Sequence, residues 1–129
     1  MKRELISGGS PYEDIVGFSR AVRVGPYISI GGTAPMDSYG NTVGIDDISV
    51  QTKQCLETIK VALEKAGSSL NDVVRTRILL TNIEDWKDAA VVRSSYFKAI
   101  KPVDTIMQVT RFINPEWLIE IEVDAIMSS

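Results

Sequence analysis

The sequence contains no histidine, and this absence restricts the chemistry that the protein can perform. Neither a Ser-His-Asp nor a Cys-His nucleophile can be built, and the commonest ligand of catalytic zinc is missing. If the protein is an enzyme, carboxylates, tyrosine, lysine, cysteine or a bound water must transfer protons. No metal-ligand cluster and no glycine-rich nucleotide-binding motif stands out, so we predict neither a metal nor a cofactor.

The sequence also lacks long apolar runs, has a single cysteine and has no excess of basic residues, and each of these observations excludes a class of protein. No stretch approaches the roughly 20 apolar residues of a membrane span. The single cysteine cannot form an internal disulfide, which fits a reducing compartment and makes the cytoplasm the expected location. Basic residues are not in excess. The net charge of −3 argues against sequence-independent binding of nucleic acid, which requires a basic surface.

The residues that are present suffice for one folded domain. The chain has 129 residues, of which 44% are hydrophobic, and this amount of apolar material can form a core. No repeat, low-complexity segment or linker divides the sequence. We therefore predict a single domain over residues 1–129.

Apolar residues at helical spacing predict a first helix that begins after Asp46 or Asp47 and ends at Gly67. A second helix is predicted from Asn82, which is placed to cap it, to about Ile100. The residues expected on the buried sides of these helices are Cys55, Leu56, Ile59, Ala62, Leu63, Ala66, Trp86, Ala89, Ala90, Val92, Tyr96 and Phe97. In this setting the cysteine is interpreted as a buried structural thiol.

Alternating patterns predict strands over residues 2–7, 18–24, 27–33, 73–81, 104–110 and 118–127. The second and third strands are joined tightly at Gly25 and Pro26, as in a hairpin. Gly31 and Gly32 end the third strand, where glycine indicates a bend or a close approach of the backbone. The order of strands and helices predicts an α+β fold, a mixed sheet with both helices on one face and some parallel pairs.

The last strand, LIEIEVDAI, carries an acidic face. Alternation places Glu120, Glu122 and Asp124 on one side and the apolar residues on the side that should pack against the helices. Arg75 and Arg77 share a face of the strand 73–81, opposite Val74, Thr76, Ile78 and Leu80. If the two strands are neighbours, the charges can pair across the sheet. Two interpretations remain open: a solvated, salt-bridged face, or the wall of a cavity between subunits.

Asp104, in the stretch KPVDTIMQV, also has two interpretations. It can be an ordinary polar residue at the start of a strand, where it caps a turn or pairs with Lys101. It can also be a functional carboxylate in a site. The pattern alone does not distinguish these alternatives.

Three segments, FSRAVRVGPYISIGGTAP, QTKQCLETIKVALEKAGSSLNDVVRTRILLTNIEDW and KPVDTIMQV with LIEIEVDAI, together span nearly the whole chain. In combination they resemble the Rid (YjgF-type) family of enamine and imine deaminases, also described as L-PSP endoribonucleases. The resemblance implies a chorismate-mutase-like fold assembled as a homotrimer. Three sheets would form a central barrel with the helices outside, and a small-molecule cleft would lie at each subunit interface.

The resemblance also implies roles for individual residues. Glu120 matches the glutamate that serves proton transfer with a bound water. Phe18 stands at a tyrosine position and lacks the hydroxyl, and Gly31 and Gly32 belong to a turn that lines the cleft. The family segment P-x-R-[ST], whose arginine holds the substrate carboxylate, reads Pro102-Val103-Asp104-Thr105 in this chain.

The exchange of arginine for Asp104 reverses a charge. A guanidinium binds a carboxylate through two charge-assisted hydrogen bonds, whereas an aspartate repels it. This favours a cleft that binds a neutral or cationic imine, with its hydrolysis as the expected reaction. The alternatives are a non-catalytic binding or interaction module, and an imino-acid deaminase that uses Arg75, Arg77 or Arg111 instead. Ribonuclease activity, named in the older family description, is disfavoured by the absence of histidine and by the acidic balance.

Overall fold

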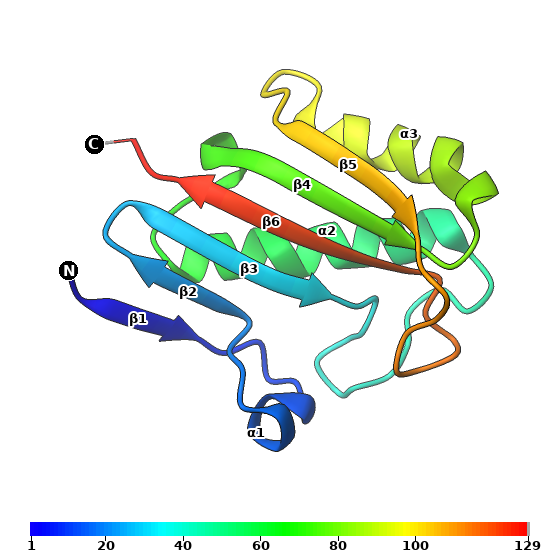
Figure 1. Ribbon diagram of the computed structural model, residues 1–129, viewed down its shortest axis with the longest axis horizontal. Helices are drawn as coiled ribbons and strands as arrows, with labels where there is room; N and C mark the ends of the chain where they lie inside the picture. The colour runs from blue at the N-terminus through cyan, green and yellow to red at the C-terminus, as the bar shows by residue number, and fades with distance from the viewer. Residues whose placement is uncertain (129) are drawn as a thin grey trace.

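The computed structural model describes residues 1–128 and confirms the α+β class, with one mixed sheet and the two longer helices against one of its faces (Figure 1). The elements are β1 (Arg3–Ile6), α1 (Tyr12–Val16), β2 (Ala21–Val24), β3 (Tyr27–Thr33), α2 (Ile48–Lys65), the 3₁₀ turn η1 (Leu70–Asp72), β4 (Val73–Leu80), the 3₁₀ turn η2 (Ile83–Asp85), α3 (Trp86–Phe97), β5 (Val103–Gln108) and β6 (Ile119–Ile126). None of the helices in this described part is long and apolar enough to cross a bilayer.

The sheet has the order β1-β2-β3-β6-β4-β5. Every neighbouring pair is antiparallel except β4 and β5, which are parallel because α3 connects them. The predicted parallel pairing is thus confirmed for one pair. The last strand lies in the middle of the sheet, between β3 and β4 (Figure 1).

The core lies between the sheet and α2, as the two periodicities predict. On β6 the side chains of Ile119, Ile121, Val123 and Ala125 are at most 1% exposed. Every predicted stripe residue of α2 is buried. Burial of such side chains contributes about 1.5–3 kcal/mol each, so this interface contributes strongly to the stability of the fold.

The ends of α2 follow the predicted capping chemistry. The side chain of Asp47 accepts a hydrogen bond from the backbone N–H of Val50 at 3.1 Å. Gly67 adopts a φ of 86° after the last turn, and the N–H groups of Gly67 and Ser68 bond back to the carbonyls of Glu64 and Leu63. These two hydrogen bonds end the helix. They require the left-handed backbone conformation at Gly67 that glycine adopts without strain.

The second predicted helix differs from the observed one. Asn82 caps the 3₁₀ turn η2, through the N–H of Glu84, and not α3 itself. The helix ends at Phe97, before the predicted Ile100. Trp86, expected in the core, is 43% exposed because it opens α3 at the rim of the domain.

Val74 was predicted to face the helices with Thr76, and this is wrong. The register between β4 and β6 shifts between Val73 and Arg75, so one extra residue is inserted. Val73 is therefore buried, and Val74 is 41% exposed. A bulge of this kind reverses the alternation locally, which strict period-two patterning cannot detect.

Candidate functional site

The chemistry-bearing residues gather around a β-bulge at the end of β3. Ile30 pairs with Val123 and Thr33 pairs with Ile121, so Gly31 and Gly32 together oppose a single residue of β6. This bulge is the irregularity that the two adjacent glycines predicted. It leaves backbone carbonyls outside the regular ladder, and these must find other donors.

Arg20, just before β2, supplies the donors. Its Nη1 atom lies 2.7 Å from the carbonyl oxygen of Gly32, 3.3 Å from that of Gly31 and 3.0 Å from Oγ1 of Thr33. Arg20 is only 7% exposed, and its guanidinium lies over the ring of Phe18 at 5.5 Å. One amino group of the guanidinium therefore fixes the bulge.

The other two nitrogens of Arg20, Nε and Nη2, make no hydrogen bond to any residue of 1–128. Neither is sealed from solvent, because Nε1 of Trp117 is the one fully buried side-chain nitrogen or oxygen without a partner in that range. Burial lowers the pKa of Arg20, while Glu13 and Glu120 raise it. Since an arginine pKa ordinarily lies far above neutral pH, the group stays charged there. Arg20 is thus a buried cation with unused donors.

Glu120 lies beside this bulge on β6, paired across the sheet with Leu79 of β4. Burial raises the pKa of Glu120 above its ordinary value of 4.5. The charge of Arg20 opposes this shift and that of Glu122 adds to it. The carboxylate packs so closely on the bulge that a Cβ added to Gly32 would lie 2.5 Å from Oε1. Glycine at this position therefore allows the observed placement of the carboxylate.

These groups line a cavity of about 400 Å³, a volume suited to a small molecule. Its walls are formed by Ser10, Tyr12, Phe18, Ser19, Arg20, Gly31, Gly32, Ala34, Met36, Ile113, Trp117, Glu120 and Glu122. We refer to this cavity as the Glu120 cleft. It brings together four of the residues singled out from the sequence, namely Phe18, Gly31, Gly32 and Glu120.

Asp104, on β5, does not line the Glu120 cleft of the single chain. It is in register with Thr76, whose side chain is fully buried on the helix-covered face. Oδ1 of Asp104 accepts a hydrogen bond from Oγ1 of Thr76 at 2.7 Å and lies 3.7 Å from Nε of Arg93 on α3. The Asp104 side chain is only 22% exposed, whereas the backbone of β5, an edge strand, is exposed to solvent. Its partners are therefore Thr76 and Arg93, and not Lys101.

Thr105 also lies apart from the Glu120 cleft. It is in register with Arg77 on the open face of the sheet. On that face Nη1 of Arg77 lies 3.3 Å from Oε1 of Glu122 and 3.7 Å from Oδ2 of Asp124. Cross-strand charge pairing is thus confirmed for Arg77, whereas Arg75 forms no ion pair with the described residues. Pairs this exposed contribute about 0–1 kcal/mol each.

Cys55 is a structural thiol, as predicted. It is fully buried, and burial raises the pKa of its thiol well above the ordinary value. A nucleophilic cysteine requires the opposite shift and an accessible sulfur. Over residues 1–128, no three side chains of the metal-binding types His, Cys, Asp and Glu converge on one point.

Sequence reasoning missed Arg20 and Trp117. Trp117 is 3% exposed and packs edge-on against Tyr12 of α1, with ring centroids 6.2 Å apart. One signal pointed to Arg20: paired glycines in a strand imply a bulge with unsatisfied carbonyls, and a basic residue on the hairpin partner is the nearest source of donors. No comparable signal marked Trp117. Its packing partner Tyr12 lies on α1, a helix that the sequence pattern did not predict.

Replacement of Gly32 by alanine is expected to displace the Glu120 carboxylate while the fold persists. Neither Gly31 nor Gly32 has a positive φ, so the backbone accepts alanine at both positions. The Cβ at Gly32 meets the mobile end of the Glu120 side chain, whereas a Cβ at Gly31 meets no atom within 4 Å. An NMR titration of Glu120 should show its pKa moving toward the ordinary value in Gly32→Ala and unchanged in Gly31→Ala. Equal titrations in both variants would contradict this placement.

The sequence of this chain is similar to a known protein family. A family model described as Endoribonuclease L-PSP matches residues 10–127. A RutC family protein of Pyrococcus abyssi is 36% identical over 122 residues, which cover 95% of each chain.

Solved structures agree with this match. Rv2704 of Mycobacterium tuberculosis, described as a member of the YjgF/YER057c/UK114 family, is 42% identical with a TM-score of 0.89, over 98% of this chain and 100% of that one. YyfA of Yersinia pestis, described as a protein of unknown function of the Rid family, is 29% identical with a TM-score of 0.87, over the same shares.

Proposed function

This chain belongs to the L-PSP endoribonuclease (YjgF/RutC) family, and on that premise we propose that it binds a small imine or enamine in the Glu120 cleft and hydrolyses it. The observation that carries the proposal is the carboxylate of Glu120, partly buried in a small-molecule cavity and packed against the β3 bulge. A carboxyl group whose pKa is raised by burial takes up a proton more readily than an ordinary carboxylate, so it can act first as a base and then as an acid.

The proposed reaction adds water across the C=N bond. The Glu120 carboxylate removes a proton from a bound water as the water oxygen attacks the imine carbon, and it passes this proton to the nitrogen, which gives a carbinolamine. Glu120 then takes the proton of the carbinolamine hydroxyl and delivers it to the nitrogen as the C–N bond breaks, so that a carbonyl compound and ammonia leave. The balance is imine plus water to carbonyl plus ammonia, with Glu120 as base and then acid.

We propose a neutral or cationic imine as the preferred substrate. The charge reversal at Asp104 removes the arginine that would hold a carboxylate, and Asp104 is itself bonded to Thr76 and Arg93. In one chain the Glu120 cleft holds one guanidinium, Arg20, and two carboxylates, Glu120 and Glu122. This balance disfavours a second anion. If an anionic imine is nonetheless preferred, Arg20 is the arginine that would bind it.

The proposal includes assembly as a homotrimer through the open face of the sheet. That face carries exposed apolar side chains beside its charges: Leu5 is 65% exposed, Val103 60% and Met107 43%. Exposed apolar side chains on the open face of a sheet, here on its two edge strands β1 and β5, are typical of a contact with another copy. A mass in solution of three times the chain's 14.2 kDa would support the assembly, and a monomer would contradict it.

Ammonia release tests the function. Imines generated in situ by an amino-acid oxidase or an amine oxidase supply anionic, neutral and cationic substrates. The purified protein is expected to release ammonia faster than buffer alone, with the neutral and cationic imines accelerated most. No acceleration with any imine would favour the second candidate, a non-catalytic module that binds a small molecule in the same cleft.

Ribonuclease activity, which the family description names, is not the function that we propose. The net charge of −3 and the acidic residues along β6 oppose the approach of a phosphate backbone. The absence of histidine also removes the usual acid–base group. Cleavage of a labelled RNA by the purified chain, lost with a variant of the Glu120 cleft, would overturn this choice.

A further inference from the structure

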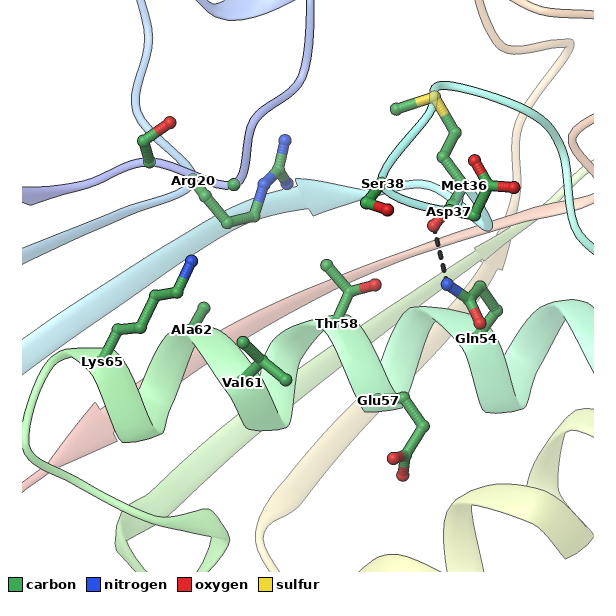
Figure 2. A pocket seen from close by; sticks show the side chains of 12 residues that line it. Arg20, Met36, Asp37, Ser38, Gln54, Glu57, Thr58, Val61, Ala62 and Lys65 are labelled. Atoms are coloured by element: carbon green, nitrogen blue, oxygen red, sulfur yellow. Dashed lines mark hydrogen bonds between the residues drawn. The ribbon is translucent and has the colours of Figure 1, made fainter.

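A second cavity lies on the helix side of the sheet, between α2 and the loops around residues 7–8 and 36–38 (Figure 2). We propose that this cavity, of about 290 Å³, is a binding site for a small oxyanion such as a sulfate, a phosphate or the carboxylate of a metabolite. We call it the Lys65 cavity. It is separate from the Glu120 cleft, and only Arg20 and Met36 line both.

The cations of the Lys65 cavity are free to bind a ligand. Arg20 is 7% exposed, and its Nε and Nη2 atoms have no hydrogen-bond partner in the described chain. Lys65 forms no ion pair with any residue of 1–128. In Figure 2 both side chains reach into the same end of the cavity. A buried guanidinium with unused donors is a group that a bound anion would satisfy.

The acidic residues of this cavity are largely occupied. Oδ1 of Asp37 accepts the backbone N–H groups of Tyr39 and Asn41, each at 2.9 Å, and so closes its own loop. Glu57 accepts a hydrogen bond from the hydroxyl of Tyr96 at 2.5 Å and points away from the cavity in Figure 2. The lining carries two cations and two carboxylates, so its formal charges cancel. Because Asp37 is held in its own loop and Glu57 points away, the positive charge gathers at the end of the cavity where Arg20 and Lys65 lie (Figure 2).

The helix supplies the floor of the cavity. Thr58, Ala62 and Lys65 follow at spacings of four and three residues and so share one face of α2. The small side chain of Ala62 leaves space between the other two (Figure 2). The hydroxyls of Thr58 and Ser38 make no hydrogen bond within the described residues and can donate to an oxyanion. Two cations and two hydroxyls around one space match the chemistry of a small oxyanion.

Occupancy of the Lys65 cavity is expected to reach Glu120 through Arg20. The charge of Arg20 stabilises the ionised form of Glu120, so an anion bound to Arg20 offsets this effect. The other charged groups that act on the pair are Glu13 on α1 and Glu122 on β6, while Cys55 stays neutral. Because coupling is reciprocal, protonation of Glu120 should strengthen anion binding. This consequence rests on the electrostatics alone and does not require the proposed hydrolysis.

The test is a titration with sulfate, which does not titrate near neutral pH, at constant ionic strength set by chloride. Backbone amide shifts of Ser38 and Thr58 are followed by NMR. The wild-type chain is expected to show saturable shifts at these amides, and Lys65→Gln and Thr58→Val should each weaken binding roughly fivefold to tenfold, a change of about 1 kcal/mol. Acetate in place of sulfate distinguishes a carboxylate site from a site for tetrahedral oxyanions.

Lys60→Gln is the matched control, because Lys60 is an exposed lysine of the same helix that does not line the cavity. It should bind sulfate like the wild type. Shifts that do not saturate, or equal weakening in Lys60→Gln and Lys65→Gln, would overturn the proposal. Glu120→Gln, which is uncharged like protonated Glu120, should bind sulfate at least as tightly as the wild type. Because this variant lacks the proposed base, sulfate binding by it does not depend on the proposed hydrolysis.

Discussion

Glu120→Gln is expected to reduce imine hydrolysis by about 10²–10⁴-fold, the range that a positioned general base contributes. The amide keeps the size and position of the carboxylate against the bulge but cannot take a proton from water. Ammonia release under saturating imine is the measurement. Asp124→Asn is the control, because Asp124 lies on the same strand and face but does not line the Glu120 cleft. Equal losses in both variants would mean that the acidic face, and not Glu120, carries the activity.

The same variant should be more stable than the wild type at neutral pH. Burial raises the folded-state pKa of Glu120, so the folded chain holds its proton more tightly than the unfolded chain does. Ionising Glu120 therefore costs folding free energy, and this cost grows as pH rises from the ordinary glutamate range through the raised pKa. Glutamine has no charge at any pH. The gain in Tm from Glu120→Gln should be present at pH 7 and should vanish below pH ~4. A Tm difference independent of pH would contradict this account.

Arg20→Met is expected to destabilise the fold by about 1–3 kcal/mol, the cost of leaving a partly buried carbonyl without its charged donor. The carbonyl of Gly32 loses its 2.7 Å bond, while that of Gly31 still accepts from Oγ1 of Thr33 at 2.8 Å. Chemical denaturation measures the change. Arg75→Met is the control and should shift stability by less than about 0.5 kcal/mol, because Arg75 forms no ion pair with the described residues.

Arg20→Lys separates charge from hydrogen bonding. A lysine ammonium keeps the positive charge near Glu120 but cannot reproduce the fixed geometry of the guanidinium. We expect Arg20→Met to raise the pKa of Glu120 further, and Arg20→Lys to hold it near the wild-type value while recovering only part of the stability. If both variants leave the pKa of Glu120 unchanged, Arg20 does not act on this carboxylate.

The layered fold could be predicted from the sequence because its main signals are periodic. The alternation along β6 and the stripe along α2 each repeat over several turns or residue pairs, and both faces are buried as expected. One residue that departs from a repeating hydrophobic pattern does not change the secondary structure that the pattern predicts. The caps at Asp47 and Gly67 fixed the length of α2 to within a residue or two for the same reason: each satisfies backbone groups that have no other partner.

The local departures could not be predicted, because each depends on a single irregularity. The bulge at Val74 buries Val73 and exposes Val74, the reverse of the alternating pattern, and no glycine in the sequence indicates it. The helix α1 is a short turn after Pro11 with no buried residue, so no apolar stripe marks it. Trp86 is exposed because its helix begins at the rim, which its composition does not reveal.

Four of the predicted site residues line one cavity, and the reason is geometric. The two glycines and Glu120 meet because β3 and β6 are neighbours, and Phe18 joins them from the segment before β2. The resemblance to the family segment P-x-R-[ST] predicts Asp104 as a cleft residue. In the single chain its side chain contacts Thr76 and Arg93. Arg20 emerged only when the unsatisfied carbonyls of the bulge were located.

The pH dependence of kcat/KM for imine hydrolysis tests the central claim most directly. The account predicts that the rate falls as pH decreases through the raised pKa of Glu120, because the base is then protonated, and that this ionisation disappears from the residual rate of Glu120→Gln. A profile of the same shape and height in both proteins, or no acceleration over buffer at any pH, would contradict it.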